Sequence, residues 1–308
     1  MRRPTLERLA RSRRAEHLLR STPGLEELLD RFLAGEHPAN AVVVGLDMVS
    51  KGLDVSFAQP QPTAQDEATA EATAEAHLEV VRLSSAAGLA HFEVSLSLPG
   101  LGSALGSDGP ALALGHARRI VEAAEAVGAQ VTIDMGRAEQ VDEVLEAVTE
   151  LRRDHPDTGV ALQAMLRRTA RDAEDLAYPG SRVRLCKGAF PSGPEHSYQS
   201  RIEVDRHFVR VLRMLMESPA YPMVATHDAR MVSITHELVR RNGRSRDDYE
   251  FQMLMGVRPF EHRRLVDTGR RLRVYIPYGR NWYPYLVHRV GDSPRALYLI
   301  GRQLLSRR

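Results

Sequence analysis

Short apolar runs recur along the chain and alternate with longer segments in which hydrophobic residues repeat with helical periodicity. Such runs are typical of strands that are buried on both faces. They occupy residues 42–46, 92–98, 130–133, 159–165, 183–186, 222–225, 249–254 and 272–276. The clearest helical segments are residues 117–127, 138–151, 202–216 and 231–241. This alternation indicates βα units and a parallel sheet.

Eight strands separated by helices predict an α/β protein with a (β/α)8 TIM-type barrel. A doubly wound sheet is the alternative, but its first turn should carry closely spaced glycines. Gly100, Gly102 and Gly106 do not fit, because the third glycine comes one residue too late. We therefore predict a single domain over residues 1–308, which comprises an N-terminal helical segment (1–37), a barrel (about 40–295) and a C-terminal helix (296–308).

Composition narrows the class of protein. The 308 residues are 43% hydrophobic and 27% charged, which are globular values. The net charge of +2 argues against a dedicated nucleic-acid binder. Cys186 is the only cysteine, which excludes an intramolecular disulfide and a cysteine-based metal site.

The same sequence predicts a cytoplasmic location. No run approaches the roughly 20 apolar residues that span a bilayer, and the Arg-rich start lacks the apolar core of a secretory signal. The first residues instead predict a basic amphipathic helix. It either packs on the domain or rests on a membrane surface, which would make the protein peripheral at the inner membrane face.

Polar residues lie near the ends of the predicted strands or just past them, at the end of the barrel where active sites lie. They are Asp47, Ser97, Asp134, Gln163, Arg184, Lys187, Thr226, His227, Asp228, Gln252 and Tyr275. Two cations and a histidine at one rim indicate an anionic ligand, such as a phosphate or a reduced cofactor. Metal binding is not predicted, because no further ligand follows His227 and Asp228 at a suitable spacing.

A second polar group lies on the helix predicted after the last strand. Tyr285, His288, Arg289 and Asp292 are spaced so that one helical face carries all four. The spacing alone is also compatible with an ordinary solvated stripe.

Six segments, in this order and spacing, resemble the FAD-dependent proline dehydrogenase family. They are residues 131–134 (VTID), 160–164 (VALQA), 184–190 (RLCKGAF), 225–228 (ATHD), 249–256 (YEFQMLMG) and 274–279 (VYIPYG). A single such segment would be a weak signal, whereas six in register are specific. The Tyr285-x-x-x-Arg289 pattern extends the resemblance to about residue 295.

The resemblance implies a barrel that binds FAD without a Rossmann motif. Arg184 and Lys187 would lie against the flavin and support catalysis by stabilising its anionic reduced form. Asp134 would belong to the polar network beside flavin and substrate. The resemblance also implies that other residues contact the cofactor, namely Gln163, Gly188, Ala189, Thr226, His227 and Gln252.

At the positions where the family binds its substrate, this chain departs from the family's pattern. Where the family holds the substrate carboxylate with two adjacent arginines, this chain has His288 and Arg289, and Asp292 stands in place of a glutamate. The family's lysine on the second strand corresponds to Ser97 in this interpretation. Arg289 would bind the carboxylate with help from His288, and Tyr275 and Tyr285 would wall the pocket.

The activity implied is oxidation of L-proline to 1-pyrroline-5-carboxylate by hydride transfer to the flavin, the first step of proline catabolism. Two alternatives remain open: a paralogue that oxidises a related cyclic amine or hydroxyproline, and a flavin-binding homologue without catalysis. The resemblance further implies a quinone as electron acceptor, with transient contact at the membrane surface.

Overall fold

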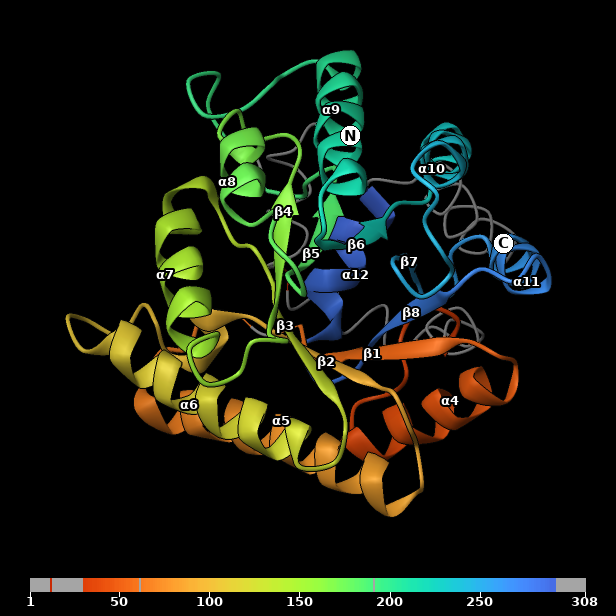
Figure 1. The fold of residues 1–308 in the computed structure, drawn as a ribbon. Helices are drawn as coiled ribbons and strands as arrows, with labels where there is room; N and C mark the ends of the chain where they lie inside the picture. The colour runs from red at the N-terminus through yellow and green to blue at the C-terminus, as the bar shows by residue number, and fades with distance from the viewer. Residues whose placement is uncertain (1–11, 13–29, 61, 191, 292–308) are drawn as a thin grey trace, which may run out of the picture.

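Eight parallel strands close into a barrel in the computed structural model, which describes residues 12, 30–60, 62–190 and 192–291 (Figure 1). The strands follow one another around the barrel in chain order, and β1 pairs with β8 to close it. Their bounds are β1 Asp54–Ala58, β2 Glu93–Leu96, β3 Gln130–Ile133, β4 Gly159–Gln163, β5 Arg182–Cys186, β6 Tyr221–Ala225, β7 Glu250–Leu254 and β8 Leu272–Pro277. The predicted (β/α)8 fold is confirmed.

Helices surround the strands, as Figure 1 shows. Each described α-helix after α4 links two consecutive strands or follows the last one. They are α4 Pro38–Ser50, α5 Glu67–Ala86, α6 Gly109–Glu125, α7 Val141–Leu151, α8 Thr169–Asp175, α9 Arg201–Glu217, α10 Ala229–Arg241, α11 Pro259–Asp267 and α12 Trp282–Gly291, with short 3-10 turns η1 Leu98–Leu101 and η2 Ala138–Gln140. The four predicted helical segments correspond to α6, α7 with η2, α9 and α10.

Alternation along each strand divides the core into two layers. In β2, Val94 and Leu96 are fully buried among other apolar residues, and they pack toward the helices. Glu93 and Ser95 point the other way and contact Arg184 inside the barrel. The interior of this barrel is therefore polar, while the hydrophobic core lies between strands and helices.

The prediction of a first strand at residues 42–46 is wrong. This valine-rich run belongs to α4, which starts with Pro38 in its first turn and carries a capping box between His37 and Asn40. The first strand is β1 instead. Asp47 consequently lies on the exposed face of this helix, where it pairs with Lys51 at 2.5 Å, and not at the end of a strand.

The other seven predicted strands are confirmed, with ends that differ by up to two residues. The domain bounds stay a prediction, because most of the N-terminal helical segment and residues 296–308 lie outside the described residues. Within the part of the chain that the structure describes, no helix combines the length and the apolar character needed to cross a bilayer.

Gly45 brings α4 into close contact with the barrel, because a Cβ there would lie 2.7 Å from the ring of Phe57. We expect Gly45→Ala to lower the free energy of unfolding by about 1–3 kcal/mol through overpacking. Gly115 in α6 is the matched control: a Cβ added there would point into open space, so Gly115→Ala should raise stability by up to about 1 kcal/mol. Denaturant unfolding measures both, and equal effects would contradict the packing argument.

His77 in α5 is 2% exposed, and its burial lowers its pKa to about 4. The unfolded chain then binds more protons than the folded one between about pH 6.5 and 4, so stability should fall as pH drops through that window. The loss is on the order of 3 kcal/mol. We expect His77→Leu to reduce this pH dependence, measured by urea unfolding at several pH values. The exposed His196→Gln should retain it, and an unchanged slope in His77→Leu would refute the assignment.

Candidate active site

Arg184 lies at the centre of the polar side chains near the mouth of the barrel. Its Nε donates to Gln252 Oε1 at 2.5 Å, and its Nη1 donates to Ser95 Oγ at 2.5 Å and to Asp134 Oδ1 at 2.6 Å. Its Nη2 forms an ion pair with Glu93. These contacts use four of the five N–H groups of a guanidinium. Contacts among the described residues therefore leave one N–H group, on Nη2, for a further partner.

Asp134 directly follows β3 and joins two site residues. Its Oδ1 accepts from Arg184, while its Oδ2 accepts a hydrogen bond from the Tyr275 hydroxyl at 3.1 Å. Desolvation in the barrel mouth raises the pKa of Asp134, more than Arg184 and Tyr275 lower it. The carboxylate is consequently a stronger proton acceptor than an ordinary aspartate.

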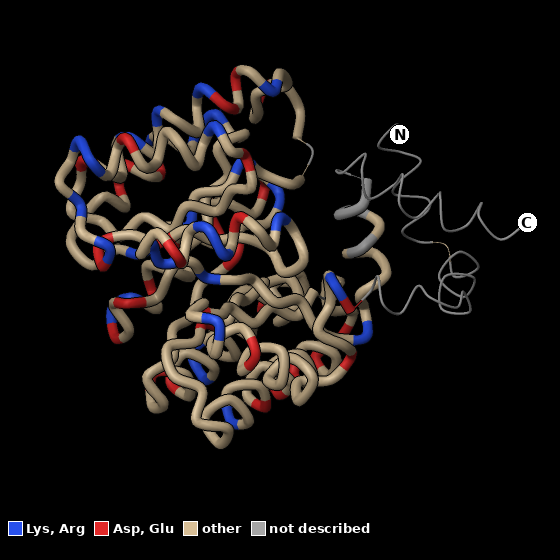
Figure 2. Tube along the Cα trace, turned by 90° about the vertical axis from the view of Figure 1, so that its right-hand side faces the viewer, with Lys and Arg blue, Asp and Glu red and all other residues tan. Residues whose placement is uncertain are grey.

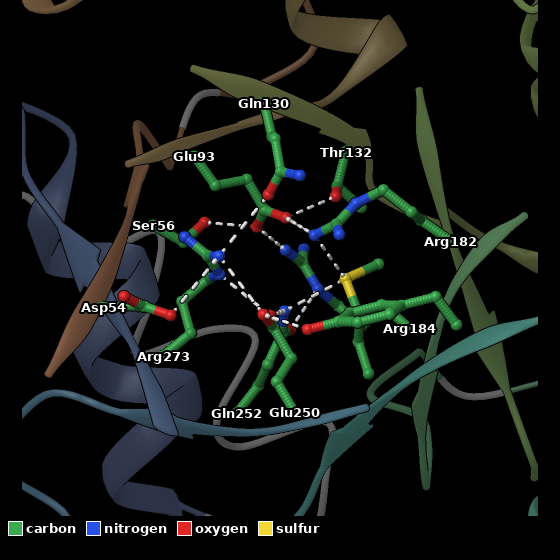
Figure 3. Close-up of polar contacts among 12 residues, drawn as sticks. Asp54, Ser56, Glu93, Gln130, Thr132, Arg182, Arg184, Glu250, Gln252 and Arg273 are labelled. Atoms are coloured by element: carbon green, nitrogen blue, oxygen red, sulfur yellow. Dashed lines mark hydrogen bonds and ion pairs between the residues drawn. The ribbon is translucent and has the colours of Figure 1, made fainter. Parts of the chain in front are cut away.

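Below Arg184 the barrel interior holds further buried charges, which Figure 3 shows. Glu250 accepts from Arg273 Nε at 2.8 Å and from Gln252 Nε2 at 2.6 Å. Burial opposes ionisation of Glu250, but the neighbouring Arg273 and Arg182 outweigh it and lower its pKa to about 2. The network keeps both of its glutamates ionised, and Arg184 is part of it.

Lys187, just past β5, lies between two carboxylates. Its Nζ is 2.5 Å from Asp205 and 2.8 Å from Asp228, and Arg230 contacts the same two carboxylates. Hydrogen bonds from Arg230 and Lys187 hold the pKa of Asp228 well below its usual range. The Lys187 side chain is 31% exposed, and these two contacts use two of its three N–H groups.

Gln163, at the end of β4, ties together two rim loops. Its Oε1 accepts from the backbone N–H of Ala189 at 3.0 Å, and its Nε2 donates to the carbonyl of Gly136 at 2.7 Å. Gly188 has φ +117, and a Cβ there would lie 2.3 Å from Met165 Sδ. The loop after β5 therefore needs glycine to lie this close to the loop after β4.

Thr226 and His227 follow β6. Thr226 Oγ1 accepts from the backbone N–H of Asp228 at 3.1 Å, and His227 Nε2 accepts from the backbone N–H of Leu254 at 2.9 Å. Since Nε2 is an acceptor, the neutral ring carries its proton on Nδ1. Both residues brace the β6 and β7 ends of the rim.

The two tyrosines lie beside this group, on β8 and α12. The Tyr275 ring centre is 5.7 Å from Arg184 Cζ. Burial, the Asp134 charge and the nearby Tyr285 raise the pKa of Tyr275, so its hydroxyl stays protonated. The predicted face of α12 is seen only in part, because the side chains of His288 and Arg289 and all of Asp292 lie outside the described residues.

The sequence predicted Arg184, Asp134, Gln252 and Tyr275 as site residues, and the structure brings them together, but Ser95 and Glu93 were missed. Ser97 lies past the end of β2 and precedes η1, where its carbonyl accepts from Gly100 and Leu101. Ser95, two residues earlier on the same face of the strand, contacts Arg184. The sequence signal that could have identified Glu93 and Ser95 is the polar residue at every second position of the otherwise apolar run 92–98.

This donor set fits a flavin. Arg184 and Lys187 place two cations at one rim, each with an N–H group beyond those that the described contacts use, and Gln163 anchors the adjoining backbone. Cations and hydrogen-bond donors suit a cofactor that becomes anionic on reduction. Among the described residues, no three side chains of the metal-ligating types are grouped to hold a metal ion.

Known proteins resemble this chain over most of its length. The family model described as "Proline dehydrogenase" matches residues 46–292. The chain is 30% identical over 297 residues to the proline dehydrogenase of Deinococcus radiodurans, covering 95% of this chain and 91% of that one. It is also 30% identical over 264 residues to proline dehydrogenase 1 of Bacillus subtilis strain 168, covering 86% of each.

Solved structures show the same fold. Proline utilization A from Bdellovibrio bacteriovorus, inactivated by N-propargylglycine, superposes with a TM-score of 0.80 at 21% identity. The match covers 90% of this chain but 33% of that one, so this chain spans about a third of the larger protein. With most of its length matched by the family model and by relatives at 30% identity, the chain belongs to the proline dehydrogenase family.

Proposed function

We propose that this chain oxidises L-proline to 1-pyrroline-5-carboxylate, with FAD as its flavin, in the first step of proline catabolism. The observation that carries the proposal is the Arg184 guanidinium, which four side chains hold at the barrel mouth beside Asp134 and Tyr275. Family membership supports an oxidoreductase that acts on the CH–NH group of proline.

The cofactor would supply the electron-accepting chemistry, taking a hydride from the carbon next to the ring nitrogen. Arg184 and Lys187 provide the positive charge that stabilises an anionic reduced flavin. Gln163 holds the backbone of Gly188 and Ala189 in place for contact with it. Thr226 and His227 would meet the rest of the cofactor. Gln252 would hydrogen-bond the flavin, and its Oε1 also accepts from Arg184.

The substrate amine must be neutral to give up a hydride. Asp134 has a raised pKa and lies against Tyr275, so it is placed to organise the polar side of the pocket. Tyr275 and Tyr285 would pack on the substrate ring. Arg289 would bind the carboxylate with His288, and Asp292 would face the amine.

A related cyclic amine or hydroxyproline is the second candidate substrate. The observation that favours it is the sequence of the predicted carboxylate clamp, in which His288 stands beside Arg289 and Ser97 replaces a lysine. A histidine cannot reproduce the bidentate contact of an arginine. A homologue without catalysis is less well supported, because Arg184 and Lys187 are both present.

The electron acceptor would be a membrane quinone, reached by transient contact between a cytoplasmic protein and the inner membrane face. Figure 2 shows that basic and acidic residues are interspersed along the described part of the chain.

The first test is an anaerobic visible spectrum of the purified protein before and after addition of L-proline. We expect flavin bands that bleach with proline, because Arg184 and Lys187 favour the reduced anion. Flavin bands that persist with proline but bleach with dithionite would refute L-proline as the substrate and favour a related cyclic amine or hydroxyproline. A colourless protein that FAD cannot reconstitute would refute the flavoenzyme.

The carboxylate clamp can be tested separately with Arg289→Met. Loss of a charge-assisted contact of roughly 2 kcal/mol or more should raise the KM for L-proline at least tenfold. Flavin content, measured from the visible spectrum, should stay at the wild-type value because Arg289 is assigned to the substrate. A KM equal to that of the wild type would show that Arg289 does not bind the substrate carboxylate.

A further inference from the structure

Glu93 is a fully buried carboxylate that contacts residues from three other strands inside the barrel. Its Oε1 accepts from Ser56 on β1 at 2.8 Å, and its Oε2 accepts from Thr132 on β3, also at 2.8 Å. Arg184 on β5 forms an ion pair with Oε1, and Arg182 lies 3.6 Å from Oε2. Figure 3 shows these side chains converging on Glu93. The carboxylate is therefore held rigidly.

The ion pair fixes one end of the Arg184 guanidinium. Nη2 is bound to Glu93, whereas Nη1 and Nε are bound by Ser95, Asp134 and Gln252. Burial opposes ionisation of Glu93, but Arg184, Arg273 and Arg182 outweigh it and lower its pKa. Arg184 thus contacts two carboxylates: the ionised Glu93 inside the barrel and Asp134 at the rim.

Glu250 provides the internal comparison. Like Glu93 it is fully buried and lies in the same cluster, but it reaches Arg184 only through Gln252. Its direct guanidinium partner is Arg273. Together, the two glutamates face three arginines, Arg182, Arg184 and Arg273, so the loss of either negative charge leaves this cluster more positive.

We propose that Glu93 is a positioning residue for the reaction: it fixes the Arg184 guanidinium and offsets part of its positive charge, and thereby sets how strongly the reduced flavin is favoured. This inference rests on the proposed function, in which Arg184 faces the flavin. No polar group of Glu93 needs to touch the cofactor or the substrate for it to act, because its effect passes through Arg184.

The test is the midpoint potential of the bound flavin in Glu93→Gln. The glutamine carbonyl oxygen can still accept from Arg184, so the guanidinium keeps its place while its charge is less offset. We expect the preference for reduced over oxidised flavin to rise about tenfold, which corresponds to about 30 mV for a two-electron couple. Glu250→Gln is the matched control and should shift the potential less.

A potential in Glu93→Gln equal to that of the wild type, or a shift no larger than in Glu250→Gln, would overturn the proposal. If Glu93→Gln does not fold, the double variant Glu93→Gln with Arg182→Gln removes one charge of each sign and is judged by the same criterion. A wild-type protein that binds no flavin would instead refute the proposed function, and the two failures are thereby told apart.

Discussion

A buried charge must be paired, and this constraint governs the interior of the barrel. Glu93 and Glu250 have no exposed surface, and Arg273 has 1%. Removing one partner of such a pair leaves an uncompensated charge in a medium of low polarity, at a cost of about 3–5 kcal/mol. Each charged side chain therefore depends on strands across the barrel. The polar interior specifies which strands face one another, while the hydrophobic layer outside supplies most of the stability.

The same network links the fold to the chemistry. Arg184 takes part in the buried cluster through Glu93 and reaches the barrel mouth through Asp134. A guanidinium held by four partners needs little reorganisation when charge develops beside it, which is the condition for electrostatic stabilisation of a reaction. The strands that position the arginine are also those that the cluster holds in register.

The sequence predicted the barrel because apolar runs mark strands regardless of which residues they contact. It failed at residues 42–46, where a run of β-branched residues forms a helix that Gly45 allows to approach Phe57. It also identified Arg184 but not Glu93. A cation within an apolar run is recognisable from the sequence alone, whereas the partner of a buried guanidinium depends on which side chains meet across the closed barrel. The contact between Ser95 and Arg184 depends on the closed barrel in the same way, while the assignment of Ser97 to the substrate stays a prediction.

The two halves of the site differ in how tightly the fold constrains them. Arg184 and its partners come from strands and are bound into the buried network, so their replacement would disturb the barrel itself. The helix α12 follows β8, the last strand of the barrel. Trp282 and Tyr283 at the start of this helix are buried. Trp282 Nε1 also donates to Glu36 Oε1 at 3.3 Å. These contacts anchor the first turn of α12. The fold thus holds the start of α12 through two buried aromatic side chains, and it holds Arg184 through buried polar side chains from other strands.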